Sequence, residues 1–197
     1  MKKFPIKAIC RAGIIAALYA VLTIYLGSIA YGPFQIRPAE ALTLLPLLYV
    51  ESIPALFVGC LIANLLSPYG VADIVVGSLV TLIAACLTYI IPRFVKNRFL
   101  RAALGGLFPV FLNAIILPVM WLIMGGMGSF WYNLLSMSCT QLVWVYVLGG
   151  PLYLAFERMS HSKRSPLYPT NHFVLRGRMN DKKKAEAVAA ETPTQEN

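Results

Sequence analysis

The chain has 197 residues, of which 58% are hydrophobic and 13% charged, and its formal net charge is +9. Soluble domains are about half apolar and a quarter charged, so this balance excludes an ordinary soluble protein and indicates one membrane domain. The basic residues flank apolar runs instead of lining a polar face, so the expected partner is the lipid bilayer and not nucleic acid.

Six apolar segments follow one another along the chain, and each is predicted to be a helix. The second and third are short for a membrane span, which needs about 20 residues, and Pro46 and Pro54 are expected to bend them. Together they predict an all-α integral membrane domain of six transmembrane helices over residues 1–158. The segments are 8–27, 38–50, 52–66, 72–91, 102–124 and 131–156.

The chain turns polar and basic after this domain. Residues 159–197 have little apolar surface to bury, so they are predicted to be a disordered cytoplasmic tail. With the N-terminus inside and six crossings, 16 of the 17 lysines and arginines lie on the cytoplasmic side and only Arg37 lies outside. This asymmetry predicts cytoplasmic N- and C-termini. An alternative is that Ser28-Ile-Ala30 is a signal-peptidase site.

Polar side chains inside the apolar segments are the main indication of function. A charge buried in a membrane segment costs about 2.5–3.5 kcal/mol, so it is a functional-site hypothesis by default. In the predicted topology these residues share the outer half of the membrane, which favours a solute pocket open to the outside. The candidates are Arg37, Glu40, Asn64, Asp73, Asn113 and Gln141. The simpler alternatives are a salt bridge between Arg37 and Glu40, and asparagines that only join helices.

The first segment carries Ala12, Ala16 and Ala20 at intervals of four residues. Small residues at this spacing form a flat stripe on which another helix can pack closely. The stripe is compatible with packing inside this chain and with docking of a separate membrane subunit, and spacing alone does not choose between them.

Several chemistries are not expected. Both histidines, His161 and His172, follow the apolar domain, and the four cysteines are scattered, so no metal centre, disulfide framework or histidine-activated nucleophile is predicted. No phosphate-binding Gly-x-x-x-x-Gly-Lys-Ser/Thr loop occurs, so the chain is not expected to hydrolyse ATP itself. A membrane enzyme with Glu40 and Asp73 as acid and base remains an alternative.

Six fragments in order carry a family resemblance. The chain resembles the QueT family of queuosine-precursor transporters, the substrate-capture (S) subunits of energy-coupling-factor (ECF) transporters, over about residues 11–156. The fragments are AALYAVLT (16–23), IRPAEALT (36–43), IPALFVGCLIAN (53–64), DIVVGSLVTLIA (73–84), FPVFLNA (108–114) and VYVLGGPL (145–152).

The resemblance implies a six-helix subunit in the plasma membrane of a prokaryote, with no cofactor. It further implies docking through the Ala12–Ala20 stripe onto a membrane coupling subunit, which two cytoplasmic ATPases energise. The substrate would be a 7-deazaguanine such as pre-queuosine-1 or queuine. A carboxylate accepts the two adjacent N–H donors of such a base, so Glu40 or Asp73 would read that edge.

One position departs from the family pattern. A Gly-Glu pair is common in the family where this chain has Thr140-Gln141. Glutamine keeps an acceptor oxygen and loses the charge, which leaves the choice of precursor open. An S subunit for another vitamin-like solute, a stand-alone facilitator and a channel subunit remain the alternative functions.

Overall fold

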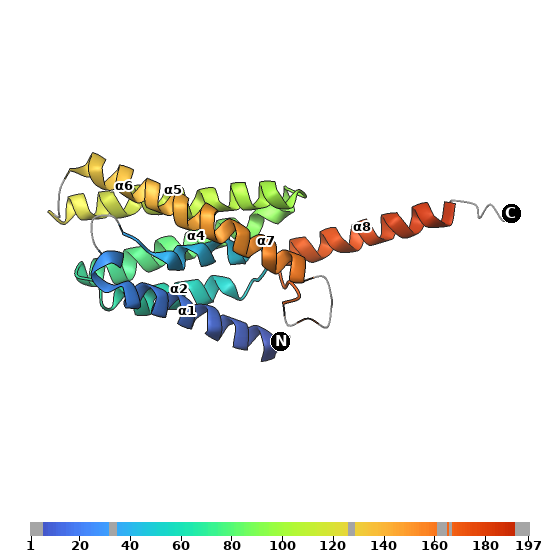
Figure 1. Cartoon of the computed structure of the whole chain (residues 1–197), viewed down its shortest axis with the longest axis horizontal. Helices are drawn as coiled ribbons and strands as arrows, with labels where there is room; N and C mark the ends of the chain where they lie inside the picture. Colours follow the sequence, from blue (N-terminus) through green and yellow to red (C-terminus); the bar gives the residue numbers. More distant parts are fainter. Residues whose placement is uncertain (1–5, 32–34, 126–128, 161–164, 166, 192–197) are drawn as a thin grey trace.

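The structure is a computed structural model that describes residues 6–31, 35–125, 129–160, 165 and 167–191. Within these ranges every regular element is helical, and most helices run lengthwise through one bundle (Figure 1). The predicted all-α class is therefore confirmed.

Four continuous helical stretches are long and apolar enough to cross a membrane: Ile6–Gly27, Gly70–Arg93, Arg98–Ile123 and Phe130–Met159. The first belongs to α1 and the third is α5, whereas the other two change helix type along their length. The elements are α1 (Ile6–Ala30), α3 (Gly70–Ala72), η2 (a π-helix, Asp73–Gly77), α4 (Ser78–Ile90), η3 (Ile91–Arg93), α5 (Arg98–Ile123), α6 (Phe130–Leu142), η4 (a π-helix, Val143–Gly149) and α7 (Gly150–Met159).

The second and third predicted segments form shorter elements. The first of them, η1, is a 3-10 helix over Pro38–Leu47, and α2 is an α-helix over Ser52–Asn64. A 3-10 helix rises about 2.0 Å per residue and an α-helix 1.5 Å, so each element reaches roughly 20 Å. That is about two thirds of the hydrocarbon core of a bilayer. The described residues between 6 and 159 form six helical segments, and full crossings by η1 and α2 stay a prediction.

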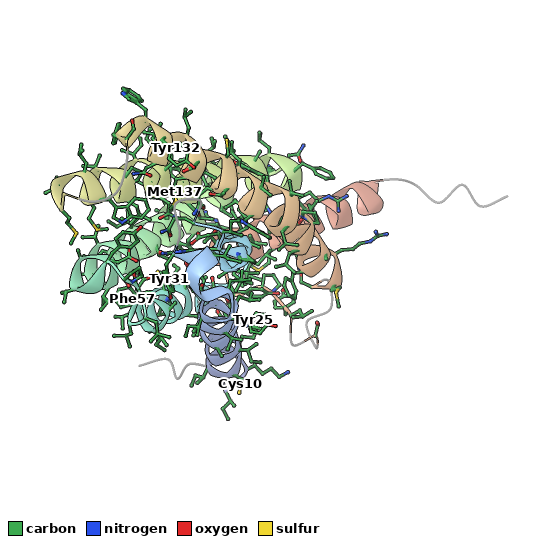
Figure 2. The ribbon with its side chains drawn as sticks, turned by 60° about the vertical axis from the view of Figure 1, so that its left-hand side comes forward. Cys10, Tyr25, Tyr31, Phe57, Tyr132 and Met137 are labelled. Carbon is green, nitrogen blue, oxygen red and sulfur yellow. The ribbon has the colours of Figure 1, made fainter. Side chains whose placement is uncertain are left out.

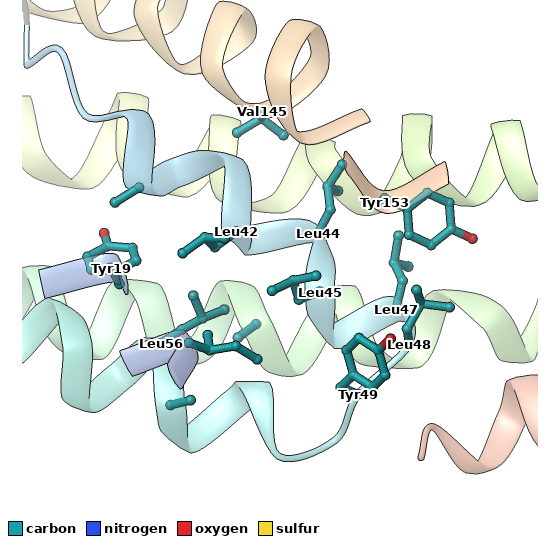
Figure 3. Close-up of a cluster of buried hydrophobic side chains, with 14 of the residues drawn as sticks. Tyr19, Leu42, Leu44, Leu45, Leu47, Leu48, Tyr49, Leu56, Val145 and Tyr153 are labelled. Atoms are coloured by element: carbon teal, nitrogen blue, oxygen red, sulfur yellow. The ribbon is translucent and has the colours of Figure 1, made fainter. Parts of the chain in front are cut away.

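The short helix η1 is the centre of the bundle. It contacts α1, α2, α4, α5, η4 and α7, and every residue from Ala39 to Leu47 is buried. A helix that is apolar on all sides is stable only when neighbours surround it, and η1 meets this condition. Figure 3 shows η1 leucines packed between α2 and the η4 region, where Leu56 and Val145 lie.

Two glycines allow neighbouring backbones to approach η1 and α1. A Cβ atom on Gly149 would lie 2.7 Å from the carbonyl oxygen of Ala41, so η4 packs directly on the η1 backbone. A Cβ atom on Gly59 of α2 would lie 2.8 Å from the carbonyl oxygen of Ala16 in α1. The alanine stripe of α1 therefore packs, at this point, against a helix of the same chain.

The C-terminal segment differs from its prediction. Residues 172–191 form helix α8, and Asn171 directly before it is fully buried, so disorder throughout 159–197 is wrong. The reason is the end of η1, whose last carbonyl groups lack partners within the helix. The backbone N–H of Asn171 donates to Leu48 O at 2.9 Å, and its Nδ2 donates to Pro46 O at 3.0 Å.

Basic residues gather at one end of the bundle. Figure 1 shows that the start of α1, the α4–α5 connection and the α7–α8 region all lie at this end. We call this end of the bundle the basic end, and we call the opposite end, where η1 begins, the far end. The described basic residues of the basic end are Lys7, Arg11, Arg93, Lys96, Arg98, Arg101, Arg158, Arg176 and Arg178.

Candidate functional site

The carboxylate of Glu40 lies at the centre of a polar cluster inside the bundle. Glu40 sits in the first turn of η1 and is only 2% exposed. Tyr19 of α1 donates its hydroxyl to Glu40 Oε1 at 2.7 Å, and Asn113 of α5 donates Nδ2 to Oε2 at 3.3 Å. Gln141 of α6 also hydrogen-bonds to this carboxylate. Donors from three helices thus converge on one acid.

A second group of polar residues lies beside the first. Arg37, at the N-terminal end of η1, places Nη2 3.5 Å from Asp73 Oδ2 and donates Nε to Ala30 O at 3.1 Å. Ser67 donates its hydroxyl to the same Asp73 oxygen at 2.6 Å. The ion pair of Arg37 is therefore made with Asp73, whereas the alternative raised from the sequence was a pair with Glu40.

Asn64 joins this second group through the π-helix. Its Nδ2 donates to the backbone carbonyl of Asp73 at 2.9 Å, at the start of η2. Gly77 ends the same π-helix, and a Cβ atom there would lie 2.8 Å from Asn64 Nδ2. A larger residue at position 77 would push the amide away from Asp73. π-Helical turns are frequent at functional sites, and this one positions an acid and an amide together.

The structure brings all six sequence-predicted polar residues together. One group is Glu40 with Asn113 and Gln141, and the other is Arg37 with Asp73 and Asn64. The two groups adjoin, because the guanidinium of Arg37 lies close enough to the Glu40 carboxylate for their charges to interact. Residues far apart in the sequence thus form one buried polar site.

Several buried polar atoms of this region have no hydrogen-bond partner within the protein. Leaving a buried donor or acceptor unpaired costs about 1–3 kcal/mol, so most folded proteins avoid it. A concentration of such atoms in one region is the property expected of a site that receives a polar molecule. The atoms are Gln35 Oε1 and Nε2, Asn64 Oδ1, Asp73 Oδ1, Ser78 Oγ, Trp121 Nε1 and Gln141 Oε1.

An aromatic and apolar wall adjoins the polar residues. Trp121 of α5 stacks on Tyr69, with ring centroids 5.1 Å apart, and belongs to a buried cluster with Leu117 and Met137. Met137 lies one helical turn before Gln141 on α6. Figure 2 shows Met137 and Tyr31 on the inner side of their segments, whereas Tyr25 is on the outer surface of α1. Aromatic faces and polar atoms therefore lie next to each other in this region.

Sequence reasoning missed Tyr19, Ser67 and Gln35. Tyr19 lies between Ala16 and Ala20, so this stretch was interpreted as a packing face and the Tyr19 hydroxyl was not considered. The sequence did contain an indication of its role, because a tyrosine on a face predicted to be buried needs a hydrogen-bond partner. Gln35 has a positive φ of 46°, which a sequence alone does not reveal.

The alanine stripe is divided between two environments. Ala20 is buried and Ala16 packs against α2, as the internal-packing alternative requires. Ala12 is half-buried and lines an apolar groove of about 410 Å³ at the basic end, between α1 and the start of α2. Docking of another subunit on this stripe stays a prediction.

A sequence model of the QueT transporter family matches residues 9–158. The chain belongs to the QueT transporter family. It is 36% identical over 111 residues to the queuosine precursor transporter QueT of Lactococcus lactis subsp. cremoris strain MG1363. That match covers 55% of this chain and 65% of the relative, just under two thirds of the relative's length. No solved structure matches.

The family match has two consequences for the site. The matched range 9–158 contains every polar residue of the Glu40 and Arg37 groups, so the site lies within the QueT transporter domain. It excludes α8, which follows that range. Family membership together with four span-length helices makes the chain a multi-pass membrane protein.

Proposed function

We propose that this protein is the substrate-capture subunit of an ECF-type transporter and imports a queuosine precursor, a 7-deazaguanine, into a prokaryotic cell. The observation that carries the proposal is the environment of Glu40. Its carboxylate receives hydrogen bonds from neutral groups of α1, α5 and α6, and none of the described cations lies within ion-pair distance of it. A buried charge without an ion partner favours a ligand that brings donors or positive charge.

The base edge of a deazaguanine suits this environment. It presents two adjacent N–H donors, and a carboxylate has about four lone-pair positions for them. The bonds from Tyr19, Asn113 and Gln141 leave Glu40 capacity for a further donor, and Gln141 Oε1 is a neighbouring unpaired acceptor. Glu40 and Gln141 would therefore read the donor edge, and the indole of Trp121 would flank the ring.

A separate role is proposed for the group of Arg37, Asp73 and Asn64, which lies beside the Glu40 group. Asp73 is already charge-balanced by Arg37 and held by Ser67, so it is the weaker candidate for reading the donor edge. The unpaired Oδ1 atoms of Asn64 and Asp73 would accept from the substituent of the base. Arg37 would close the entrance by holding the start of η1 against η2.

In the proposed topology the protein lies in the plasma membrane and crosses it six times, with both termini in the cytoplasm. The gathering of the start of α1, the α4–α5 connection and α7–α8 at the basic end supports it, because cytoplasmic ends of membrane proteins are rich in lysine and arginine (Figure 1). The site at the start of η1 then lies toward the outside, where a precursor would be captured.

Energy for transport would come from partners. Ala12 and the apolar groove beside it are proposed to receive the membrane coupling subunit, which two cytoplasmic ATPases would drive. The groove supports this role because its exposed wall is almost wholly apolar, although Glu51 also lines it. The apolar lining residues are Ala8, Ile9, Ala12, Val50, Ile53 and Pro54. Exposed apolar surface of this kind at small residues suits close helix packing in lipid.

The test is uptake of labelled pre-queuosine-1 and queuine by cells that lack their own precursor synthesis. Cells would express this chain and the two ATPases, with and without the coupling subunit, and membrane insertion would be checked by immunoblot. The proposal predicts uptake that needs both this chain and the coupling subunit and that falls in the Glu40→Gln variant. Uptake without the coupling subunit would show a stand-alone facilitator, and no uptake of either compound would show that the substrate is another solute.

A further inference from the structure

A pocket of about 430 Å³ at the basic end is separate from the Glu40 site. It lies where η3 and the α4–α5 connection meet α5 and α8. Four of its eight lining residues are basic and none is acidic. The lining residues are Pro92, Arg93, Lys96, Arg101, Phe173, Arg176, Gly177 and Asn180.

The start of α8 is fixed in place, so this pocket is a built feature of the fold. Asn171 donates Nδ2 to Tyr89 O at 3.0 Å and caps α8 by accepting from Phe173 N at 3.0 Å. The rings of Tyr89 and Phe173 pack with centroids 5.6 Å apart. The wall formed by Phe173 and Arg176 is therefore held against the end of α4.

The four basic side chains of the pocket differ in their burial and in their contacts with the protein. Arg101 is buried, donates Nε to Val95 O at 2.7 Å and lies 3.7 Å from Glu157. Arg93, Lys96 and Arg176 are exposed around the same space. One fixed and three adjustable donors of like charge in one pocket repel one another, and an anion placed among them relieves this repulsion.

The position of the pocket at the membrane interface limits the chemical class of its ligand. It lies at the ends of two span-length helices, Gly70–Arg93 and Arg98–Ile123. Phe94 in the connection between them and Phe99 in the first turn of α5 are exposed, and exposed aromatic rings at the end of a span are typical of the membrane interface. Basic pockets between helices at this depth suit the phosphate of a lipid headgroup.

We propose that this pocket binds a phosphate group through Arg93, Lys96, Arg101 and Arg176. An anionic phospholipid of the adjacent leaflet and a soluble phosphate compound present the same chemistry. The site is independent of the proposed transport function. It depends on α8, which lies outside the range matched by the family model.

The test uses the purified full chain and native mass spectrometry in detergent. One arm titrates phosphatidylglycerol with phosphatidylcholine as the reference lipid, and the other titrates pyrophosphate. The pocket variant is R93Q/K96Q/R176Q, which changes three exposed residues and leaves Arg101 in place. The matched control is K7Q/R98Q/R158Q, which removes three basic residues from the same end outside the pocket.

Each exposed basic side chain that contacts the bound phosphate should contribute about fivefold in affinity, or about 1 kcal/mol. The pocket variant should therefore bind on the order of 100-fold more weakly, and the control no more than about threefold more weakly. Selective loss in the lipid arm identifies a headgroup, and selective loss in the pyrophosphate arm identifies a soluble phosphate. Equal losses in both variants, or no binding of either probe by the wild type, would overturn the proposal.

Discussion

Replacing Glu40 by glutamine tests the binding site with almost no change of shape. The substitution keeps one acceptor oxygen, exchanges the other for an N–H donor and removes the charge. Tyr19 and Asn113 donate to different oxygens of Glu40, at 2.7 and 3.3 Å, so one of them would then face a donor. A ligand N–H loses the charged acceptor in the same way.

The size of the effect follows from the strength of charged hydrogen bonds. Such a bond contributes about 1.5–3 kcal/mol, so Glu40→Gln should weaken binding of a deazaguanine by roughly 10- to 150-fold. Isothermal titration calorimetry on the purified protein in detergent measures this change directly. Membrane insertion and yield should stay at the wild-type level, since no bulk is added.

Glu51→Gln is the matched control. Glu51 is also buried, at 4% exposure, but it lies beyond the other end of η1 and forms an ion pair with Arg11. Its substitution should lower thermal stability and leave affinity within about twofold, because it breaks a buried pair far from the site. Equal affinity of Glu40→Gln and the wild type would refute the assignment of Glu40 as a ligand contact.

Two further predictions concern the packing around η1. Gly149→Ala should lower the free energy of unfolding by about 1–3 kcal/mol, because the new methyl group meets the Ala41 carbonyl at 2.7 Å. Gly150→Ala, where nothing lies within 4 Å, should be neutral or slightly stabilising in the same thermal unfolding assay. Asn171→Ala removes bonds to Pro46 O and Tyr89 O and the α8 cap, so it should cost about 2–4 kcal/mol.

A single melting result would refute each of these packing predictions. If both glycine variants melted at the wild-type temperature, η4 would not pack on the η1 backbone as described. If Asn171→Ala left the melting temperature unchanged, the segment before α8 would not hold the end of η1. Hydrogen exchange at η1 amides provides a second measurement of the same contact.

The six helical segments and the convergence of the six polar residues were predictable from the sequence. Long apolar runs define helices in a membrane protein, and polar residues placed at one depth of a membrane must find one another. The predicted ranges agree with the observed elements to within a few residues, for example 52–66 against Ser52–Asn64 for α2.

The 3-10 form of η1 and the pairing of Arg37 were not predictable in this way. A 3-10 helix of ten residues is rare, and what stabilises it here is burial on all sides together with donors from Asn171, which is remote in sequence. Arg37 lies one turn from Glu40 along the chain, yet Asp73 of a different helix is its ion partner. Both features depend on contacts between segments that are distant in the sequence, and local sequence patterns do not predict such contacts.

We propose that the Glu40 site recognises the donor edge of a deazaguanine. The most direct measurement is equilibrium binding of labelled pre-queuosine-1 and queuine to the purified protein, with unlabelled 7-deazaguanine and adenine as competitors. We predict saturable binding that 7-deazaguanine displaces and adenine does not, because adenine lacks the two adjacent N–H donors of that edge. Equal displacement by adenine, or no saturable binding of either labelled base, would rule out recognition of that edge by Glu40.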